Sequence, residues 1–220
     1  PLCRPRPMEH KPELADESIA TRRSDNVTDL PADMPGWARA IIVPIDLLNL
    51  WIGKVVGFLI LPLIFAMTYE IFVRKAFTAP TAWAFDISRM LYGAMFILGS
   101  AYGLSKGIHI RSDFLYRNWP IKNQGRVDLF LYLVFFLPSM VIFLWVSTEW
   151  AMKSLAAGER GMDSAWMPLL GPIKSTLPIG VLLLLLQGLS ETVKSWYAAT
   201  RGRWPNETYD PEAELAGKEG

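Results

Sequence analysis

Four pairs of polar residues stand three or four positions apart near the ends of apolar stretches, so each pair falls on one face of a helix. Three pairs set an acid before a base and one sets a glutamine before a glutamate: Glu70 and Arg74, Asp86 and Arg89, Glu149 and Lys153, Gln187 and Glu191. A charge at the middle of a membrane costs roughly 2.5–3.5 kcal/mol on insertion scales, so such groups are kept for a reason. The spacing allows each acid–base pair to form within its own helix, and a partner on another helix or subunit is the alternative.

The patterns of common catalytic, cofactor and metal sites are missing. The two histidines, His10 and His109, lie outside the apolar stretches and do not form the pair that ligates a membrane haem. Cys3 is the one cysteine, so it predicts neither an intrachain disulfide nor a metal site. No glycine-rich phosphate loop or nucleophile motif occurs, and a net charge of +1 gives no sign of a nucleic-acid partner. We expect no enzyme, no cofactor and no metal.

A transport pathway inside this chain would need ionisable groups or interrupted helices near the middle of the membrane, where substrates and coupling ions are held. None of the apolar stretches carries a charge in its central third, and no inverted repeat is visible. This absence favours a scaffold over a permeation pathway.

The apolar stretches are the elements that must position the charged pairs. They cover about residues 50–73, 84–104, 127–150 and 173–193. As a helix, each is long enough to cross a hydrocarbon core about 30 Å thick. The expected fold is therefore all-α, with four transmembrane helices in two hairpins.

Basic residues are distributed unequally between the segments that flank these stretches. The segment before the first stretch, the second connection and the C-terminal segment hold six, five and four of them, whereas the first and third connections hold two each. Because basic loops stay in the cytoplasm, both termini and the middle loop are expected there.

Three flanking regions complete the expected organisation of the chain. Residues 1–36, rich in proline and charge, are expected to be a disordered cytoplasmic tail, and residues 195–220 a C-terminal cytoplasmic tail. Residues 37–49 carry apolar residues at helical spacing and predict an amphipathic helix on the membrane surface. The alternative is that 37–49 is the ragged start of the first membrane helix. The membrane domain then covers residues 50–194.

Prolines and small residues mark irregular points in the expected helices. Pro62, Pro138 and Pro178 lie inside the first, third and fourth stretches and predict kinks, and Pro44 predicts a kink or break before the first. Glycine pairs four apart occur in two helices and would allow close helix contacts: Gly53 with Gly57, and Gly99 with Gly103.

Several segments, in their order along the chain, resemble one family. They are Tyr69-Glu70-Ile71-Phe72-Val73-Arg74, Pro80-Thr81-Ala82-Trp83 with Asp86, Leu98-Gly99-Ser100-Ala101-Tyr102, His109-Ile110-Arg111-Ser112-Asp113, Gly158-Glu159, Pro178-Ile179-Gly180 and Leu186-Gln187-Gly188. This order is similar to that of the small (DctQ-like) membrane subunit of tripartite ATP-independent periplasmic (TRAP) transporters. The similarity extends over about residues 50–194. Lys75 departs from it, because the family often has an aromatic residue there.

The resemblance implies a multi-pass protein of the bacterial inner membrane with two protein partners. A periplasmic solute-binding protein would capture an organic acid or related solute, and a large membrane subunit would carry it inward, driven by an ion gradient. The small subunit would pack beside the large one. An alternative is an assembly or sensor subunit of an unrelated membrane complex, and a third possibility is independent transport or channel activity.

Candidate site residues follow from the charges and the resemblance together. Residues expected at a subunit interface or in assembly are Tyr69, Glu70, Arg74, Trp83, Asp86, Arg89, His109, Arg111, Asp113, Gln187 and Glu191. The spacing favours a local Glu70–Arg74 pair, whereas the deeper Asp86 and Arg89 favour a partner on another helix or subunit. Arg111 and Asp113 are also explained by loop charge and helix capping. Glu159 is a candidate contact for the binding protein, or a solvated loop charge.

Overall fold

The computed structural model describes residues 30–31, 33–79, 81–106, 120–162 and 164–205, and over these residues the fold is helical. They contain no strand, only an isolated bridge between Arg160 and Leu169. The helices are α2 (Gly36–Gly57), α3 (Ile60–Phe77), α4 (Ala84–Ser105), α6 (Ile121–Leu131), the π-helical turn η1 (Tyr132–Phe136), α7 (Leu137–Ala157) and α8 (Leu170–Arg201).

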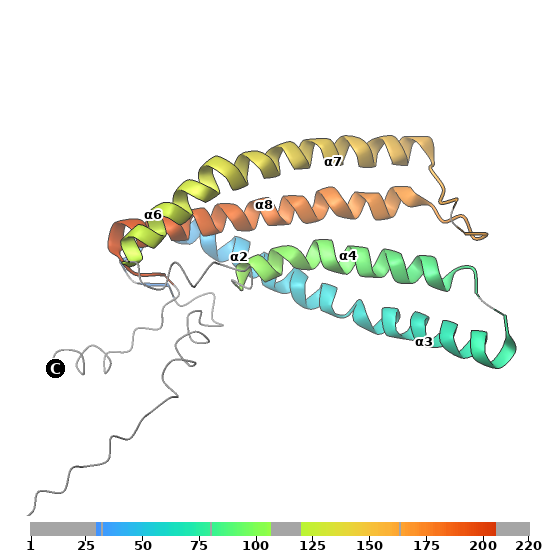
Figure 1. Cartoon of the computed structure of the whole chain (residues 1–220). Coiled ribbons are helices and arrows are strands. Elements are labelled where there is room, and N and C mark those ends of the chain that lie inside the picture. Colours follow the sequence, from blue (N-terminus) through green and yellow to red (C-terminus); the bar gives the residue numbers. More distant parts are fainter. Residues whose placement is uncertain (1–29, 32, 80, 107–119, 163, 206–220) are drawn as a thin grey trace, which may run out of the picture.

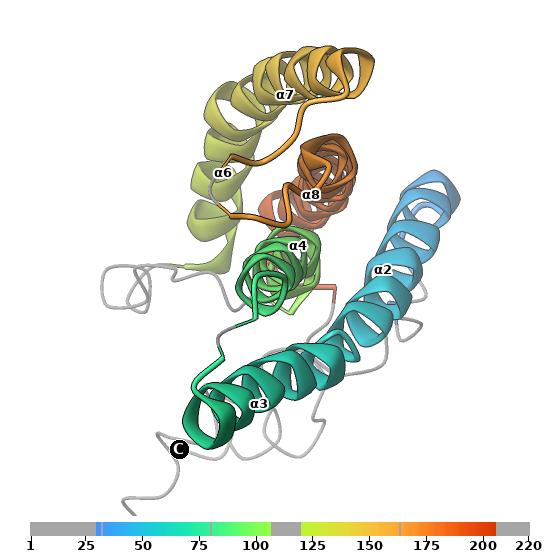
Figure 2. The ribbon, with the colours of Figure 1, turned by 90° about the vertical axis from the view of Figure 1, so that its right-hand side faces the viewer.

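The long helices lie side by side, and α8 is in the middle of them (Figures 1 and 2). It contacts α2, α4, α6 and α7, whereas α3 packs against α4. Three helical runs are long and apolar enough to cross a membrane: Gly36–Phe77, Ile121–Ala157 and Leu170–Arg201. α4 is not one of these three, although it lies between α3 and α8.

The beginning of the first run differs from the expected boundary between a surface helix and a membrane helix. α2 continues from Gly36 to Gly57 with Pro44 inside it, so no break occurs near residue 49. The break lies instead at Phe58–Leu59, immediately before Pro62. Pro62 has no N–H to donate to the Phe58 carbonyl, which accepts from Leu61 at 3.1 Å instead. Proline in the first turn of α3 is readily tolerated.

The second run, Ile121–Ala157, is also modified by a proline, but without a break. The turn before Pro138 is the π-helix η1, whose wider backbone lies where the proline ring would clash with the carbonyl four residues earlier. α8 by contrast contains Pro178 within one uninterrupted helix. The sequence therefore marked positions of possible disruption, and the local backbone took a different form at each.

Glycines let neighbouring helices approach α8 closely. A β-carbon on Gly180 would meet Ile97 of α4, and one on Gly188 would meet Phe136 of η1. Gly53 of α2 lies against the Tyr102 ring of α4, so this member of the expected glycine pairs does mark a tight contact. The other three, Gly57, Gly99 and Gly103, have open space at the β-carbon position among the described residues.

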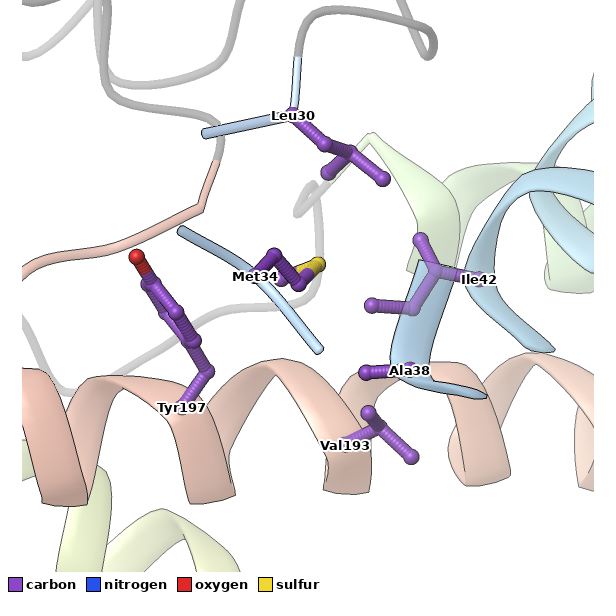
Figure 3. Close-up of a cluster of buried hydrophobic side chains, with 6 residues drawn as sticks. All are labelled: Leu30, Met34, Ala38, Ile42, Val193 and Tyr197. Carbon is purple, nitrogen blue, oxygen red and sulfur yellow. The ribbon is translucent and has the colours of Figure 1, made fainter. Parts of the chain in front are cut away.

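A buried apolar cluster joins the beginning of α2 to the end of α8. It consists of Leu30, Met34, Ala38, Ile42, Val193 and Tyr197 (Figure 3). Leu30 and Met34 belong to the segment 1–36, which the sequence predicts to be a disordered tail. Their apolar side chains are buried against α8, which favours an ordered backbone. α8 likewise continues to Arg201, into the expected C-terminal tail.

Candidate functional site

A network of buried polar side chains connects α2 to α8 near the apolar cluster. At its centre is Asp46, whose carboxylate accepts from Lys194 and, at 2.8 Å and 3.0 Å, from Ser190 and Gln187. Lys194 also pairs with Glu191 at 3.0 Å. The Lys194 side chain is 2% exposed and that of Asp46 is 4% exposed. Oppositely charged groups from two helices are thus buried together.

The Asp46 carboxylate fixes the orientation of the two amides beside it. Because Asp46 only accepts when ionised, the Gln187 amide nitrogen must face it. The Gln187 oxygen then faces Asn49, whose amide nitrogen donates to it at 2.7 Å. This leaves the Asn49 side-chain oxygen without a hydrogen-bond partner among the described residues. The network therefore has a fixed direction, from Asn49 through Gln187 to Asp46.

This network suits structural fixation better than chemistry. The described residues contain no group of three or more histidine, cysteine or acidic side chains placed to hold a metal. A buried ion pair is costly to break, because the remaining charge has no compensation. Inside a membrane bundle such groups must be satisfied by other protein groups. The network consequently sets the position of α2 against α8.

Sequence reasoning found only part of this network. Gln187 and Glu191 were expected on one face of the fourth membrane helix, and they do lie together, with the Gln187 amide 3.3 Å from Glu191. Asp46, Asn49 and Lys194 were missed because the expected helix boundaries excluded them. A readable signal existed, since α8 repeats polar residues at intervals of three and four: Gln187, Ser190, Glu191 and Lys194.

At the opposite end, the α3–α4 connection is held by Glu70. Its carboxylate pairs with Arg74 at 2.6 Å, as the spacing predicted, and accepts from both the hydroxyl and, at 3.0 Å, the backbone N–H of Thr81. The rings of Tyr69 and Trp83 stack beside it with centroids 5.5 Å apart. Tyr69, Glu70, Arg74 and Trp83 therefore form one local cluster that closes the turn.

Asp86 ties the start of α4 to the α7–α8 connection. It is fully buried, accepts from the Ser164 hydroxyl and lies 3.6 Å from Arg89. Arg89 also lies over the Phe85 ring, 5.8 Å from its centroid. The partner that the structure gives Asp86 is thus a connection residue of the same chain, and a partner on another helix or subunit stays a prediction.

Glu159 closes the α7–α8 connection on itself. The Glu159 carboxylate accepts hydrogen bonds from Lys174 and, at 2.7 Å, from Ser154. The bond from Lys174, and to a smaller extent that from Ser154, lowers the pKa of the Glu159 carboxyl. Lys174 in turn lies 4.3 Å from the centroid of the Trp150 ring. Glu159 is thus already engaged within the chain. The Glu149–Lys153 pair, at 2.6 Å, is exposed nearby.

The candidate residues do not converge on one centre. Gln187 and Glu191 belong to the α2–α8 network, and those from Tyr69 to Arg89 lie at the other end of α4 (Figure 1). His109, Arg111 and Asp113 lie outside the described residues. A further contact, which sequence reasoning missed, joins Asp33 to Arg203 at 2.5 Å. The hydrogen bond from the Arg203 guanidinium is the main cause that lowers the pKa of Asp33.

Comparison with known protein families gives a match over more than half of the chain. A family model described as "Tripartite ATP-independent periplasmic transporters, DctQ component" matches residues 63–197. The matched part begins in α3 and ends in the last turns of α8, so it includes Glu70, Asp86, Glu159 and the α8 half of the buried network. No curated protein and no solved structure matches the chain.

Proposed function

Because this chain belongs to the DctQ component family, and is therefore the small membrane component of a TRAP transporter, we propose that it acts as a static scaffold for the large membrane subunit. The single observation that carries this proposal is the Asp46–Lys194 pair. It uses the charged groups buried between α2 and α8 to fix one helix against another. A moving or ion-carrying part would need such groups free to exchange partners.

The proposal includes four membrane crossings with both termini in the cytoplasm. α4 supplies the fourth crossing, since it lies between α3 and α8 and its 22 residues are long enough for the hydrocarbon core. The excess of basic residues near the ends of the chain and in the middle connection supports this orientation. The start of α2 then lies at the cytoplasmic surface, and the connection 158–169 faces the periplasm of a bacterial inner membrane.

In this proposal, other components of the transporter recognise and move the solute. A periplasmic binding protein would deliver an organic acid or related solute, and the large subunit would move it with an ion gradient. In this chain, the buried charges Asp46, Glu191 and Lys194 pair with one another, which supports assigning the choice of solute to the partners. Glu159 is engaged with Lys174, so its contribution to docking would be the shape of the loop it closes.

Co-purification and reconstitution test this proposal. The tagged chain should capture a membrane protein of roughly a dozen spans, encoded beside it together with a secreted binding protein. Vesicles containing only the tagged chain should take up no solute, whereas vesicles with both membrane subunits should do so when the binding protein and an ion gradient are supplied. Uptake by the chain alone would contradict the scaffold role, and capture of an unrelated complex would favour an assembly or sensor subunit.

A further inference from the structure

We propose that one outward face of α4 is the surface on which a transmembrane helix of the large membrane subunit packs, an inference that rests on the proposed function. We call this face the α4 seam. It consists of Phe85, Arg89, Tyr92, Phe96, Gly99 and Gly103.

Helix geometry places these residues on one side of α4. They follow one another at intervals of four and three, the spacing of a seam that faces another helix. Tyr92 and Phe96 are 60% and 70% exposed, and Gly99 and Gly103 have nothing within 4 Å of a β-carbon position among the described residues. The buried residues Ala94 and Ala101 lie on the opposite side of the helix.

The α4 seam differs from the other exposed surfaces of the bundle. The exposed faces of α3 and α7 carry large apolar side chains, as expected for contact with lipid: Leu61, Ile64, Phe65, Ile142, Trp145 and Val146 among them. On α4, the half of the seam nearer the helix end instead exposes glycine, which gives lipid little apolar surface but lets another helix backbone come close. α4 is also absent from the helices apolar enough to cross a membrane by composition. It is nevertheless positioned between α8 and α3 (Figure 2), so a protein partner suits its outer face.

Charge defines what the partner helix must offer. Near the beginning of the seam, the Arg89 side chain is 48% exposed while it pairs with Asp86. An acidic side chain or an open backbone carbonyl at this level would complement the exposed part of the Arg89 guanidinium. The partner is thus an apolar helix with an acceptor near its periplasmic end and small or flat residues opposite Gly99 and Gly103.

Site-directed cross-linking of the assembled transporter tests this placement. In a Cys3→Ser background, Phe96→Cys on the α4 seam and Ile142→Cys on α7 would each be treated with a membrane-permeant cysteine-to-lysine or photoactivatable cross-linker. We expect a cross-linked product with the large subunit from Phe96→Cys and none from Ile142→Cys. Two outcomes would overturn the inference, provided that the large subunit still co-purifies. One is a cross-link to the large subunit from Ile142→Cys but not from Phe96→Cys, and the other is a cross-link between two copies of this chain. Failure of the unmodified chain to capture any large subunit would instead overturn the proposed function.

Glycine substitutions supply an independent measurement. Gly99→Leu and Gly103→Leu should lower recovery of the large subunit about tenfold, the effect of losing about 1.4 kcal/mol of helix contact. The matched control is Gly93→Leu, because Gly93 is also open but lies roughly 80° around α4 from Gly103. Gly93→Leu should leave recovery of the large subunit unchanged. All three variants should fold like the unchanged chain, as measured by thermal unfolding of the isolated protein. Equal recovery from all three variants would overturn the inference.

Discussion

Lys194 on α8 donates to the carboxylate of Asp46 on α2, although 148 residues separate them along the chain. Both side chains are almost completely buried, and Ser190, Gln187 and Glu191 surround the pair. This contact fixes the first helix of the bundle against the last. It also lies beside the apolar cluster around Tyr197, so polar and apolar contacts hold the same end of the molecule.

Lys194→Met should destabilise the isolated chain by about 3–5 kcal/mol, because the Asp46 carboxylate would stay buried without its cation. The measurement is thermal unfolding of the purified protein in detergent. The double variant Asp46→Asn with Lys194→Met should recover part of the loss, because it removes the buried Asp46 charge but still leaves the buried Glu191 carboxylate without Lys194.

The matched control for this substitution is Lys153→Met, which removes a lysine from the exposed pair with Glu149. Exposed pairs contribute little, so its unfolding curve should overlay that of the unchanged protein. Equal losses from Lys194→Met and Lys153→Met would contradict the importance given to the buried pair.

Glu70→Gln should loosen the α3–α4 connection without unfolding the bundle. The substitution removes the charge that Arg74 pairs with and weakens the two bonds from Thr81. Hydrogen exchange should show faster exchange of the Thr81 amide, with α8 unchanged. Thr81→Val, which keeps the backbone bond and removes only the hydroxyl, should have a smaller effect, and the reverse order would contradict this account.

The sequence predicted local features of this fold better than contacts between distant segments. The bounds of α4, Ala84–Ser105, agree closely with the expected stretch, and the Glu70–Arg74 pair follows from helical spacing alone. The partners of Asp46 could not be read in this way, because they become neighbours only when α2 packs on α8. Hydropathy also predicted that the last membrane helix ends before Lys194. A lysine is normally found at the edge of a membrane segment, and its buried counter-ion Asp46 cannot be recognised from the sequence.

Prolines show the same limit within single helices. Pro62 coincides with a break, Pro138 with a π-helical turn, and Pro44 and Pro178 with continuous helix. The missing N–H is common to all four, but the carbonyl it leaves can be satisfied in several ways. Which way is taken depends on packing around each site, and a single sequence does not reveal that packing.

Gly180→Ala should destabilise the chain by about 1–3 kcal/mol, because the added methyl group would overpack the α4–α8 contact. It would meet the Ile97 side chain and lie 3.0 Å from the Ile97 carbonyl oxygen. Combination with Ile97→Ala should recover part of the loss, since the side chain can be shortened but the carbonyl remains. Gly93→Ala is the control, because a methyl group added at Gly93 would face open space. Alanine has a higher helix propensity than glycine, so this variant should be as stable as the unchanged chain or more stable. Thermal unfolding of the four proteins checks the order.

Acidification should release the α7–α8 connection through Glu159. The hydrogen bonds from Lys174 and Ser154 favour the ionised carboxylate and hold its pKa below the ordinary value. The stabilisation is therefore fully present above the ordinary glutamate pKa of about 4.3 and is lost as the pH falls through the lowered value. The reporter is the Leu170 amide, which donates to the Glu159 carbonyl at 2.9 Å. Its hydrogen-exchange protection, relative to the intrinsic rate at each pH, should stay constant from pH 7 to about 5 and then decrease. Glu159→Gln, which lacks the titrating group, should show low protection that does not change over this range. A decrease of equal size in Glu159→Gln would assign the effect to another group.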